Sequence, residues 1–307
     1  MNQGPRIVFM GTPAFAVASL KALMEAKLNV VAVVTAPDKP AGRGMQLQQS
    51  AVKQFALAHN LPVLQPEKLK APEFLEALSA YQPDLQIVVA FRMLPEKIWS
   101  FPPMGTLNVH GSLLPDYRGA APINWAIMNG EKFTGVTTFQ LQHAIDTGDI
   151  LMQEKIVISE NMTAGELHDI MMEVGANVLV KTVNGLVQKN ITAQPQAIPS
   201  VDKHAPKIFT KDCEINWHQS VEQIHNMVRG LAPFPGAITK VDGKVVKLFS
   251  TTKEITTPKE APGSFIIEDK KIAKFACENG YLILNDIQWE GKKRMPIEDF
   301  LRGYRAI

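Results

Sequence analysis

Short apolar runs alternate with stretches of helical periodicity over the first 150 residues of the chain. The apolar runs that are typical of buried strands are Ile7–Met10, Val30–Thr35, Leu85–Ala90 and Thr106–His110. Helical spacing occurs between or after them, over Ala14–Met24, Ser50–Ala58 and Ala121–Met128. Continuous apolar strands separated by helices predict an α/β fold with a doubly wound, mostly parallel sheet that is covered on both faces.

Two further strand-like runs follow, Gly135–Leu141 and Ile150–Ile158, with only a loop between them. This arrangement predicts an antiparallel hairpin at the edge of the sheet. Apolar residues then recur at helical intervals over Ala164–Val187, which predicts one long helix. The first domain is therefore expected to span residues 1–188.

A change of composition marks the end of that domain. Residues 189–205 are polar, contain Pro195 and Pro199 and lack periodicity, so we expect a linker there. Beyond it, Ser220–Leu231 predicts a helix that opens with a capping box of Ser220 and Gln223. Short strands separated by turns then predict a small β-barrel domain over residues 206–307: Gly236–Val241, Val245–Phe249, Lys271–Ala276 and Tyr281–Gln288.

Composition supports a globular protein of two domains. The chain has 307 residues, of which 46% are hydrophobic and 20% charged, so it can bury a full core. The charges are unevenly distributed. Residues 1–205 carry 16 Lys and Arg against 17 Asp and Glu, whereas residues 206–307 carry 16 against 13, a balance of +3. A mildly basic C-terminal domain is compatible with a polyanionic partner.

The two cysteines, Cys213 and Cys277, are not in metal-binding or disulfide patterns, so we expect neither a metal site nor a disulfide. The N-terminus enters a strand directly, without the pattern of a signal peptide. No run of 18 apolar residues occurs, so we expect no membrane partner. The expected location is the cytoplasm.

The candidate chemistry is centred on Asn108 and His110, which lie two residues apart near the C-terminal end of a predicted strand and so face the same side. Asp146 follows in a predicted turn. An amide, an imidazole and a carboxylate suit acyl transfer to an amine. The amide and a protonated imidazole can stabilise the oxyanion, and the amine must also lose a proton, for which the His–Asp pair gives a base and its orienting partner. The alternatives are a structural histidine and an aspartate that only forms the turn.

Several motifs resemble those of the formyltetrahydrofolate-dependent formyltransferases. They are Asn108-Val-His110, Ser112-Leu-Leu-Pro115, Tyr117-Arg-Gly-Ala-Ala-Pro-Ile123 and Asp146-Thr-Gly-Asp149. The resemblance implies that Asn108, His110 and Asp146 are catalytic and that Ser112, Leu113, Leu114 and Pro115 border the folate. It also implies a small open-barrel (OB-like) domain after the linker, 10-formyltetrahydrofolate as the formyl donor, and no metal.

The resemblance extends over the whole chain and is greatest to the family members that formylate initiator methionyl-tRNA. The supporting motifs are Val8–Ala16, Ala36-Pro-Asp-Lys-Pro-Ala-Gly-Arg-Gly44 and Leu301-Arg-Gly-Tyr304. Lys39 and Arg43 in the second motif are implied RNA contacts, with an ordinary solvated loop as the alternative for Lys39. Relatives often carry more Lys or Arg after this motif, where this chain has Met45–Gln49. We expect a monomer.

A second departure concerns the implied pterin-bordering loop of Phe91, Arg92, Met93 and Leu94. Family members that act on tRNA usually have Ala-Tyr-Gly where this chain has Ala-Phe-Arg. Arg92 therefore adds a charge that the family pattern does not explain. The first strand is not followed by G-x-G-x-x-G, so NAD binding is not expected.

Four alternative functions remain open from the sequence. Formylation of an amino sugar nucleotide uses a similar core, but the Arg43 loop and the basic C-terminal domain argue against it. A purine-pathway formyltransferase would be shorter and would have a glycine-rich phosphate loop. A non-catalytic RNA-binding protein would have no reason to keep Asn108, His110 and Asp146 together. Hydrolysis of formyl folate could use the same residues as a side activity.

Overall fold

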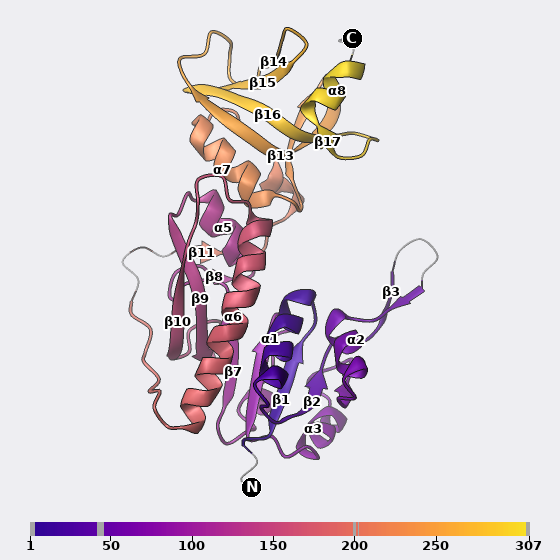
Figure 1. The fold of residues 1–307 in the computed structure, drawn as a ribbon, viewed down its shortest axis with the longest axis vertical. Helices are drawn as coiled ribbons and strands as arrows, with labels where there is room; N and C mark the ends of the chain where they lie inside the picture. The colour runs from indigo at the N-terminus through magenta and orange to yellow at the C-terminus, as the bar shows by residue number, and fades with distance from the viewer. Residues whose placement is uncertain (1–3, 42–45, 199–200, 202, 305–307) are drawn as a thin grey trace. The chain divides into compact units, whose positions relative to one another are not determined.

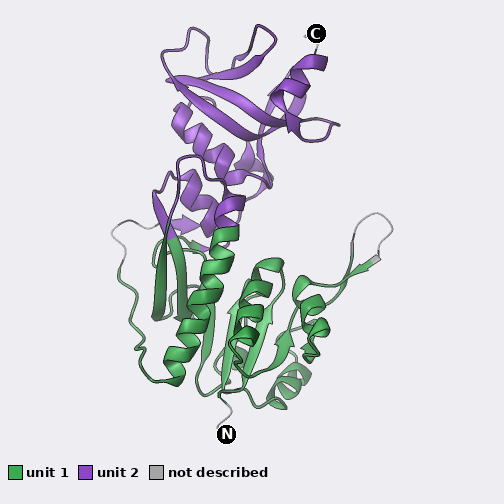
Figure 2. Ribbon diagram, in the orientation of Figure 1, with its two compact units in different colours: residues 1–118, 135–156, 169–203 green, residues 119–134, 157–168, 204–307 purple. Residues whose placement is uncertain are grey.

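The computed structural model describes residues 4–41, 46–198, 201 and 203–304. These residues form two compact units, which we describe separately (Figure 2). Unit 1 comprises residues 1–118, 135–156 and 169–203, and unit 2 comprises residues 119–134, 157–168 and 204–307. Most of the elements are labelled in Figure 1.

Unit 1 is built on a seven-stranded sheet with the order β10-β9-β7-β6-β1-β2-β5. The strands are β1 (Ile7–Gly11), β2 (Val30–Val34), β5 (Val63–Leu64), β6 (Leu85–Val89), β7 (Thr106–His110), β9 (Phe133–Gln140) and β10 (Ile150–Val157). The five strands from β7 to β5 are parallel, and β9 pairs antiparallel with β7. The predicted mostly parallel sheet is confirmed.

Strand order reverses beside β1. The chain builds β1, β2 and β5 in one direction and then returns to place β6 and β7 on the other side of β1. Such a reversal leaves a crevice at the carboxyl ends of the strands, where open α/β sheets bind ligands. His110 is the last residue of β7 and therefore lies at this edge.

Every residue of β1 is buried, which indicates that both faces of the sheet are covered. The helices of the first 190 residues are α1 (Ala14–Glu25), α2 (Ala51–Ala58), α3 (Pro72–Ser79), α4 (Glu96–Trp99), α5 (Pro122–Met128) and α6 (Ala164–Val187). Val8 and Met10 share a core cluster with Phe74 of α3 and Ile98 of α4, while α1 contacts β1 and β6. The hydrophobic pattern of the sequence does not predict α3 or α4, which are short.

Helix α6 is the one described helix that is long and apolar enough, by length and composition, to cross a membrane. In unit 1 its apolar face is part of the protein interior. A Cβ on Gly175 would lie 3.3 Å from Val109 of β7 and 3.5 Å from Val136 of β9, so the helix packs directly on the sheet. Its Leu179 and Val183 are fully buried. The composition of α6 is thus that of a core helix.

Unit 2 contains a six-stranded antiparallel sheet with the order β12-β13-β16-β15-β14 and with β17 paired to β16. The elements are α7 (Val221–Leu231), β12 (Ala237–Val241), β13 (Lys244–Ile255), β14 (Phe265–Glu268), β15 (Ile272–Cys277), β16 (Gly280–Trp289), β17 (Met295–Pro296) and α8 (Ile297–Gly303). The small C-terminal β domain expected from the sequence is confirmed, and its sheet is antiparallel. The capping box is also confirmed: Ser220 and Gln223 bond each other's backbone N–H. Strand β13 runs past the predicted Phe249 through a bulge at Leu248–Thr251.

A buried polar cluster connects α7 to the neighbouring segments of unit 2. The His225 ring is 3% exposed, and its two nitrogens contact Thr251 Oγ1 at 2.9 Å and Asn161 Oδ1 at 3.2 Å. Arg229, one turn later, donates to the carbonyl oxygen of Met162 at 3.0 Å. Burial, assisted by the charges of Lys253 and Arg229, lowers the pKa of His225 from 6.5 to about 4.

This low pKa predicts a pH-dependent stability. Between pH 6.5 and 4 the unfolded chain binds a proton at residue 225 and the folded chain does not, so stability falls as the pH falls through that window. At about 1.4 kcal/mol for each pH unit of difference, the loss is on the order of 3 kcal/mol. Denaturant unfolding of His225→Gln between pH 7 and 4 should show a flatter profile than the native protein. His143→Gln, at an exposed ring, serves as the control. An unchanged profile for His225→Gln would contradict the assignment.

Candidate active site

The site is formed where β6 and β7 end and where the turn between β9 and β10 returns to them. Strand β7 lies between β6, its parallel neighbour, and β9, its antiparallel neighbour. Asn108 is registered with Val88 on one side and Phe139 on the other, and His110 is registered with Thr137. Both side chains are therefore fixed by strands that are paired along their length.

The His110 ring is 6% exposed, with a hydrogen bond at Nε2 and a carboxylate near Nδ1. Nε2 lies 2.9 Å from the carbonyl oxygen of Tyr117, and Nδ1 lies 3.8 Å from Asp146 Oδ2. A carbonyl oxygen can only accept, so Nε2 carries a hydrogen in this contact. The Asp146 distance is too long for a direct hydrogen bond but within the range of an ion pair. Thus the structure brings His110 and Asp146 together, as their sequence motifs predict.

Asp146 occupies a tight turn. Its φ of 53° is in the left-handed region, which Asp tolerates better than most residues. Gly148 follows against the end of β9, where a Cβ would meet the carbonyl oxygen of Gln140. The carbonyl oxygen of Asp146 accepts from Arg118 Nε at 3.1 Å and from Gln196 Nε2 at 2.8 Å. The backbone of Asp146 is therefore held by two donors on its carbonyl oxygen.

Asn108 is half-buried on β7. Its side-chain amide has no hydrogen-bond partner among the residues whose placement the structure describes. A half-buried amide at the carboxyl edge of a parallel sheet is thus left available for a ligand. This contrasts with His110, whose Nε2 already has a hydrogen-bond partner.

The segment after β7 is held by internal hydrogen bonds. Ser112 Oγ donates to the carbonyl oxygen of Asp116 at 2.6 Å, and Thr137 Oγ1 donates to the carbonyl oxygen of Ser112 at 2.7 Å. The Leu114 N–H donates to Thr137 Oγ1 at 3.1 Å, and Gln153 Nε2 donates to the Leu114 carbonyl oxygen at 3.0 Å. Leu113 is half-buried, Leu114 is buried and the Leu114–Pro115 peptide is cis. The segment that the sequence places beside the folate is therefore rigidly shaped by β9 and β10.

The positive charge of Arg92, in the loop after β6, has partners in the structure. Its guanidinium donates to the carbonyl oxygens of Pro66 at 2.8 Å and Glu67 at 3.1 Å and lies 5.3 Å from the centroid of the Phe91 ring. Its partial burial lowers the pKa of Arg92. Met93 is exposed, whereas Leu94 belongs to the core around α3 and α4. Arg92 thus joins the β6–α4 loop to the segment after β5.

Of the two predicted RNA contacts, Arg43 lies outside the described residues. Lys39 is exposed at the start of a two-stranded ribbon of β3 (Lys39–Ala41) and β4 (Gln46–Gln48). The residue before it, Asp38, accepts from Lys53 Nζ at 2.6 Å and from Gln65 Nε2 at 2.8 Å, and these hydrogen bonds lower its pKa. At the same end of the ribbon, just after β4, Ser50 Oγ is 2.7 Å from Thr35 Oγ1. Both strands of the ribbon are therefore attached to unit 1 at its base.

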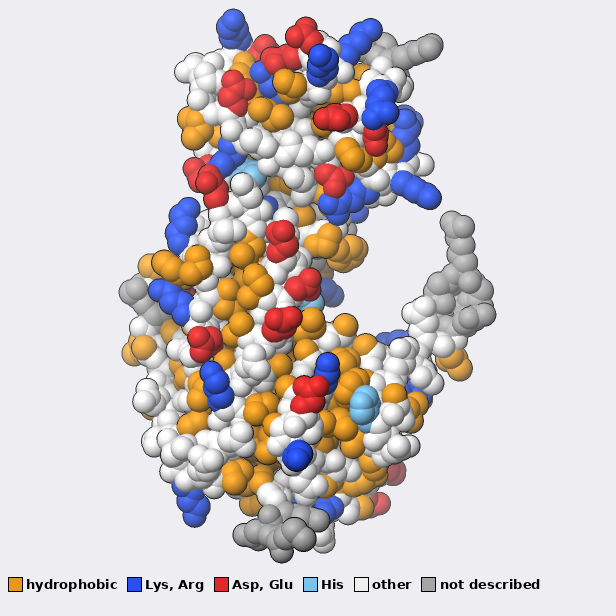
Figure 3. All heavy atoms as spheres, in the orientation of Figure 1, with side chains coloured by type: hydrophobic (Ala, Val, Ile, Leu, Met, Phe, Trp, Pro, Cys, Tyr) orange, Lys and Arg blue, Asp and Glu red, His pale blue; other side chains and the backbone are white. Residues whose placement is uncertain are grey.

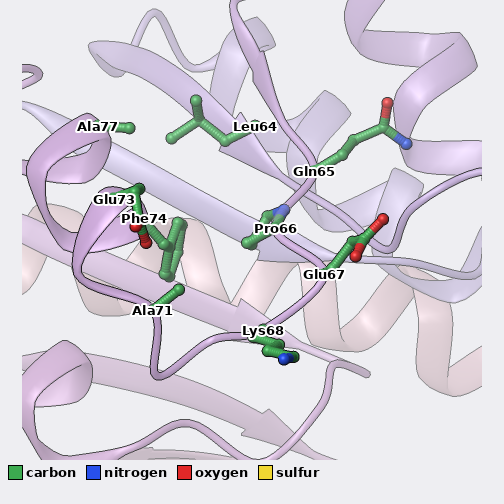
Figure 4. A pocket seen from close by; sticks show the side chains of 9 residues that line it. All are labelled: Leu64, Gln65, Pro66, Glu67, Lys68, Ala71, Glu73, Phe74 and Ala77. Atoms are coloured by element: carbon green, nitrogen blue, oxygen red, sulfur yellow. The ribbon is translucent and has the colours of Figure 1, made fainter.

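A surface hollow of about 440 Å³ lies beside the segment that Arg92 contacts (Figure 4). Its lining is mainly apolar and includes Leu64, Pro66 and Phe74, with charged residues Glu67 and Lys68 among the others. No predicted site residue lines it. Among the residues with described placement, no group of three or more His, Cys, Asp or Glu side chains could hold a metal ion.

Four residues that support the site were given no role from the sequence: Tyr117, which opens one of the motifs, and Thr137, Gln153 and Gln196. Tyr117 offers only its backbone oxygen to His110, so its side chain carries no signal of that role. Thr137 lies opposite His110 in the register of β7 with β9, which could have indicated it. Gln153 lies on β10, the edge strand beyond β9, and has no such register with β7. Gln196 lies in the expected linker and contacts residues about 50 positions earlier, for which the sequence gives no local pattern.

The fold and the site define a class of group-transfer enzymes. A model of the formyl transferase family matches residues 5–183, and a model of the formyl transferase C-terminal domain matches residues 207–305. The chain belongs to the formyl transferase family.

Its curated relatives make the assignment more specific, because they are methionyl-tRNA formyltransferases. The chain is 46% identical to the enzyme of Bacteroides fragilis, with 97% of this chain and 95% of the relative covered. It is 50% identical to the enzyme of Parabacteroides distasonis, with coverage of 98% and 96%.

Solved structures with lower identity share the fold. The structure of HypX from Aquifex aeolicus in complex with tetrahydrofolic acid has a TM-score of 0.65 at 20% identity, covering 97% of this chain and 47% of that one. WlaRD, a sugar 3N-formyltransferase, has a TM-score of 0.66 at 19% identity, covering 94% and 99%. The same fold therefore serves formyltransferases with different acceptors.

Proposed function

We propose that this chain transfers the formyl group of 10-formyltetrahydrofolate to the α-amine of initiator methionyl-tRNA, which supplies formylmethionyl-tRNA for translation initiation. The observation that carries the proposal is the similarity to methionyl-tRNA formyltransferases over nearly the whole of both chains. The position of Asn108, His110 and Asp146 at the carboxyl edge of the sheet supports it. We place the reaction in the cytoplasm and expect the protein to act as a monomer.

The chemistry follows from the placement of the three side chains. Attack by the α-amine on the formyl carbon forms the new C–N bond and puts negative charge on the formyl oxygen. The unpartnered Asn108 amide is suited to donate to that oxygen, which stabilises the transition state. The amine loses a proton, and the bond from the formyl carbon to N10 of the folate breaks as N10 gains one. We assign this proton transfer to His110, with Asp146 as its orienting partner.

The folate site is proposed at the two loops that flank β7 and β6. Ser112, Leu113, Leu114 and Pro115 form one side, and Phe91, Arg92, Met93 and Leu94 form the other. The hydrogen bonds of the first loop to Thr137 and Gln153, and of Arg92 to Pro66 and Glu67, support this assignment because they preorganise both loops. Arg92 is proposed to act by holding its loop.

RNA contact is proposed for Lys39, Arg43 and the C-terminal domain. Lys39 is exposed at the base of the β3–β4 ribbon. On the face of unit 2 shown in Figure 3, Lys and Arg side chains lie among Asp and Glu side chains. The balance of +3 over residues 206–307 suits a phosphate backbone, because phosphate contacts supply affinity without requiring base recognition.

We propose a catalytic domain over residues 1–188, a connecting segment over 189–205 and a tRNA-contacting domain over 206–307. The family models, which match residues 5–183 and 207–305, support this division. Within unit 2, however, α5 packs on α7: Asn124 Nδ2 donates to the Gly230 carbonyl oxygen at 2.7 Å. A fragment ending at residue 188 would contain α5 but lack α7, on which α5 packs. We therefore propose residues 1–188 as a functional division and not as a unit that folds on its own.

The identity of the formyl acceptor is tested by offering the protein methionyl-tRNA and, separately, amino sugar nucleotides. Purified protein given labelled formyl folate should formylate methionyl-tRNA and leave amino sugar nucleotides unmodified.

Affinity for the tRNA should fall steeply with salt, because phosphate contacts release counterions. Arg43→Ala should raise the KM for methionyl-tRNA and leave formyl-folate binding unchanged. Formylated sugar nucleotide as the product, together with a flat salt dependence, would favour the amino-sugar reaction instead.

Asn108 is tested by truncation of its amide. If the amide stabilises the oxyanion, Asn108→Ala should lower kcat by roughly 10²–10³-fold with little change in the binding of either substrate. The half-buried position makes a large loss of stability unexpected, and a thermal melt checks this. A loss of kcat below about tenfold would assign Asn108 to packing.

His110 and Asp146 are tested as a pair. Two groups that act as one unit have non-additive effects, so the double alanine variant should be about as slow as the slower single variant. Single-turnover rates of the four proteins give the comparison. If the effects of the two single substitutions multiply, the two residues act independently and the pair is not the proton-transferring unit.

A further inference from the structure

The segment expected to be a linker lies alongside the turn that carries Asp146. The Ile150 N–H donates to the Gln194 carbonyl oxygen at 2.7 Å, and the Gln194 N–H donates back to the Ile150 carbonyl oxygen at 2.8 Å. This isolated bridge fixes the chain two residues before Gln196. The Gln196 side chain is thereby brought to the Asp146–Gly148 turn, and all these residues belong to unit 1.

Both the NH₂ group and the oxygen of the Gln196 side-chain amide form hydrogen bonds. Nε2 donates to the carbonyl oxygens of Asp146 and Gly148, both at 2.8 Å. Oε1 accepts from the guanidinium of Arg118, whose Nε also donates to the Asp146 carbonyl oxygen at 3.1 Å. Two carbonyl oxygens need donors and a guanidinium needs an acceptor, so only a neutral amide satisfies all three partners.

These contacts fix the backbone from which the Asp146 carboxylate projects. The residue has a φ of 53°, a conformation that persists only where the surroundings hold it. Two donors on its carbonyl oxygen restrict rotation of the following peptide. The carboxylate is thereby kept 3.8 Å from His110 Nδ1. A small rotation of this peptide would swing the carboxylate away from the ring.

We propose that Gln196, together with Arg118, is a positioning residue for the reaction: it holds the Asp146 turn so that the carboxylate faces His110. The proposal rests on the proposed function, since it requires Asp146 to orient His110. Gln196 acts on the transition state through Asp146 and contacts no substrate. Its loss should therefore lower kcat and leave the KM values for formyl folate and methionyl-tRNA nearly unchanged.

The test compares three variants of the full chain. Gln196→Ala removes all contacts of the amide, and Gln196→Glu keeps an acceptor for Arg118 but has no donor for the two carbonyl oxygens. Gln194→Ala, two residues earlier, is the matched control because its side chain is exposed and its bridge to Ile150 uses backbone atoms only. We expect both Gln196 variants to lose roughly 10- to 100-fold in kcat, as misplacement of a reacting group does, and the control to retain full kcat.

A double-variant cycle separates positioning from general destabilisation. In an Asp146→Ala background there is no carboxylate to position, so adding Gln196→Ala should slow single-turnover formylation no further. Hydrogen exchange of the amides at residues 144–150 gives a readout independent of activity, and exchange should be faster in both Gln196 variants than in Gln194→Ala.

Three outcomes would overturn the proposal: an unchanged kcat in Gln196→Glu, an equal loss with and without Asp146, or unchanged exchange over the turn. A native protein that formylates no methionyl-tRNA would contradict the proposed function instead. In that case the exchange measurement still decides whether Gln196 holds the turn.

Discussion

The pairing of β7 with β6 on one side and β9 on the other is the constraint on which the site depends. Parallel pairing with β6 brings the loop of Phe91–Leu94 to the same edge as His110, because parallel strands end together. Antiparallel pairing with β9 sets Thr137 opposite His110 and ends β9 beside Leu107, and the loop that follows β9 places the Asp146 carboxylate beside the His110 ring. Without both pairings, residues separated by 36 positions in the sequence would not meet across 3.8 Å.

Within that frame, polar side chains mainly bind backbone groups of neighbouring loops. Thr137, Gln153, Arg92, Gln65 and Gln196 each satisfy carbonyl or N–H groups of segments distant in sequence. Loops lack the repeating hydrogen bonds of helices and strands, so each buried polar group in them needs an individual partner. The backbone of β7 is already paired with two strands, so it needs no hydrogen bond from the Asn108 side chain. The Asn108 amide therefore stays available for a ligand.

The sequence predicted the elements whose signals are local. Buried strands of β-branched residues, the 24-residue helix α6 and the Ser220 capping box were found close to their observed bounds, because each rests on periodicity or on contacts within one turn. Helices α3 and α4 were missed because each is short and neither has a side-chain cap. Contacts such as that of Gln196 with Asp146 were missed for a different reason: they join residues 50 positions apart and depend on the fold itself. The catalytic candidates came from motif resemblance, and spacing alone left a structural role for His110 open.

Arg92 shows how a departure from a family pattern can be absorbed next to a site. From the sequence, a guanidinium in place of glycine adds a positive charge to the loop beside the proposed pterin position. In the structure the charge is directed at two carbonyl oxygens of the segment after β5 and at the Phe91 ring. Carbonyl oxygens partly compensate a buried cation, and the fork geometry of Arg allows both to be bonded at once. The substitution therefore changes what supports the loop. A lysine at this position could not provide the same support, since its single ammonium lacks the planar fork that reaches Pro66 and Glu67 together.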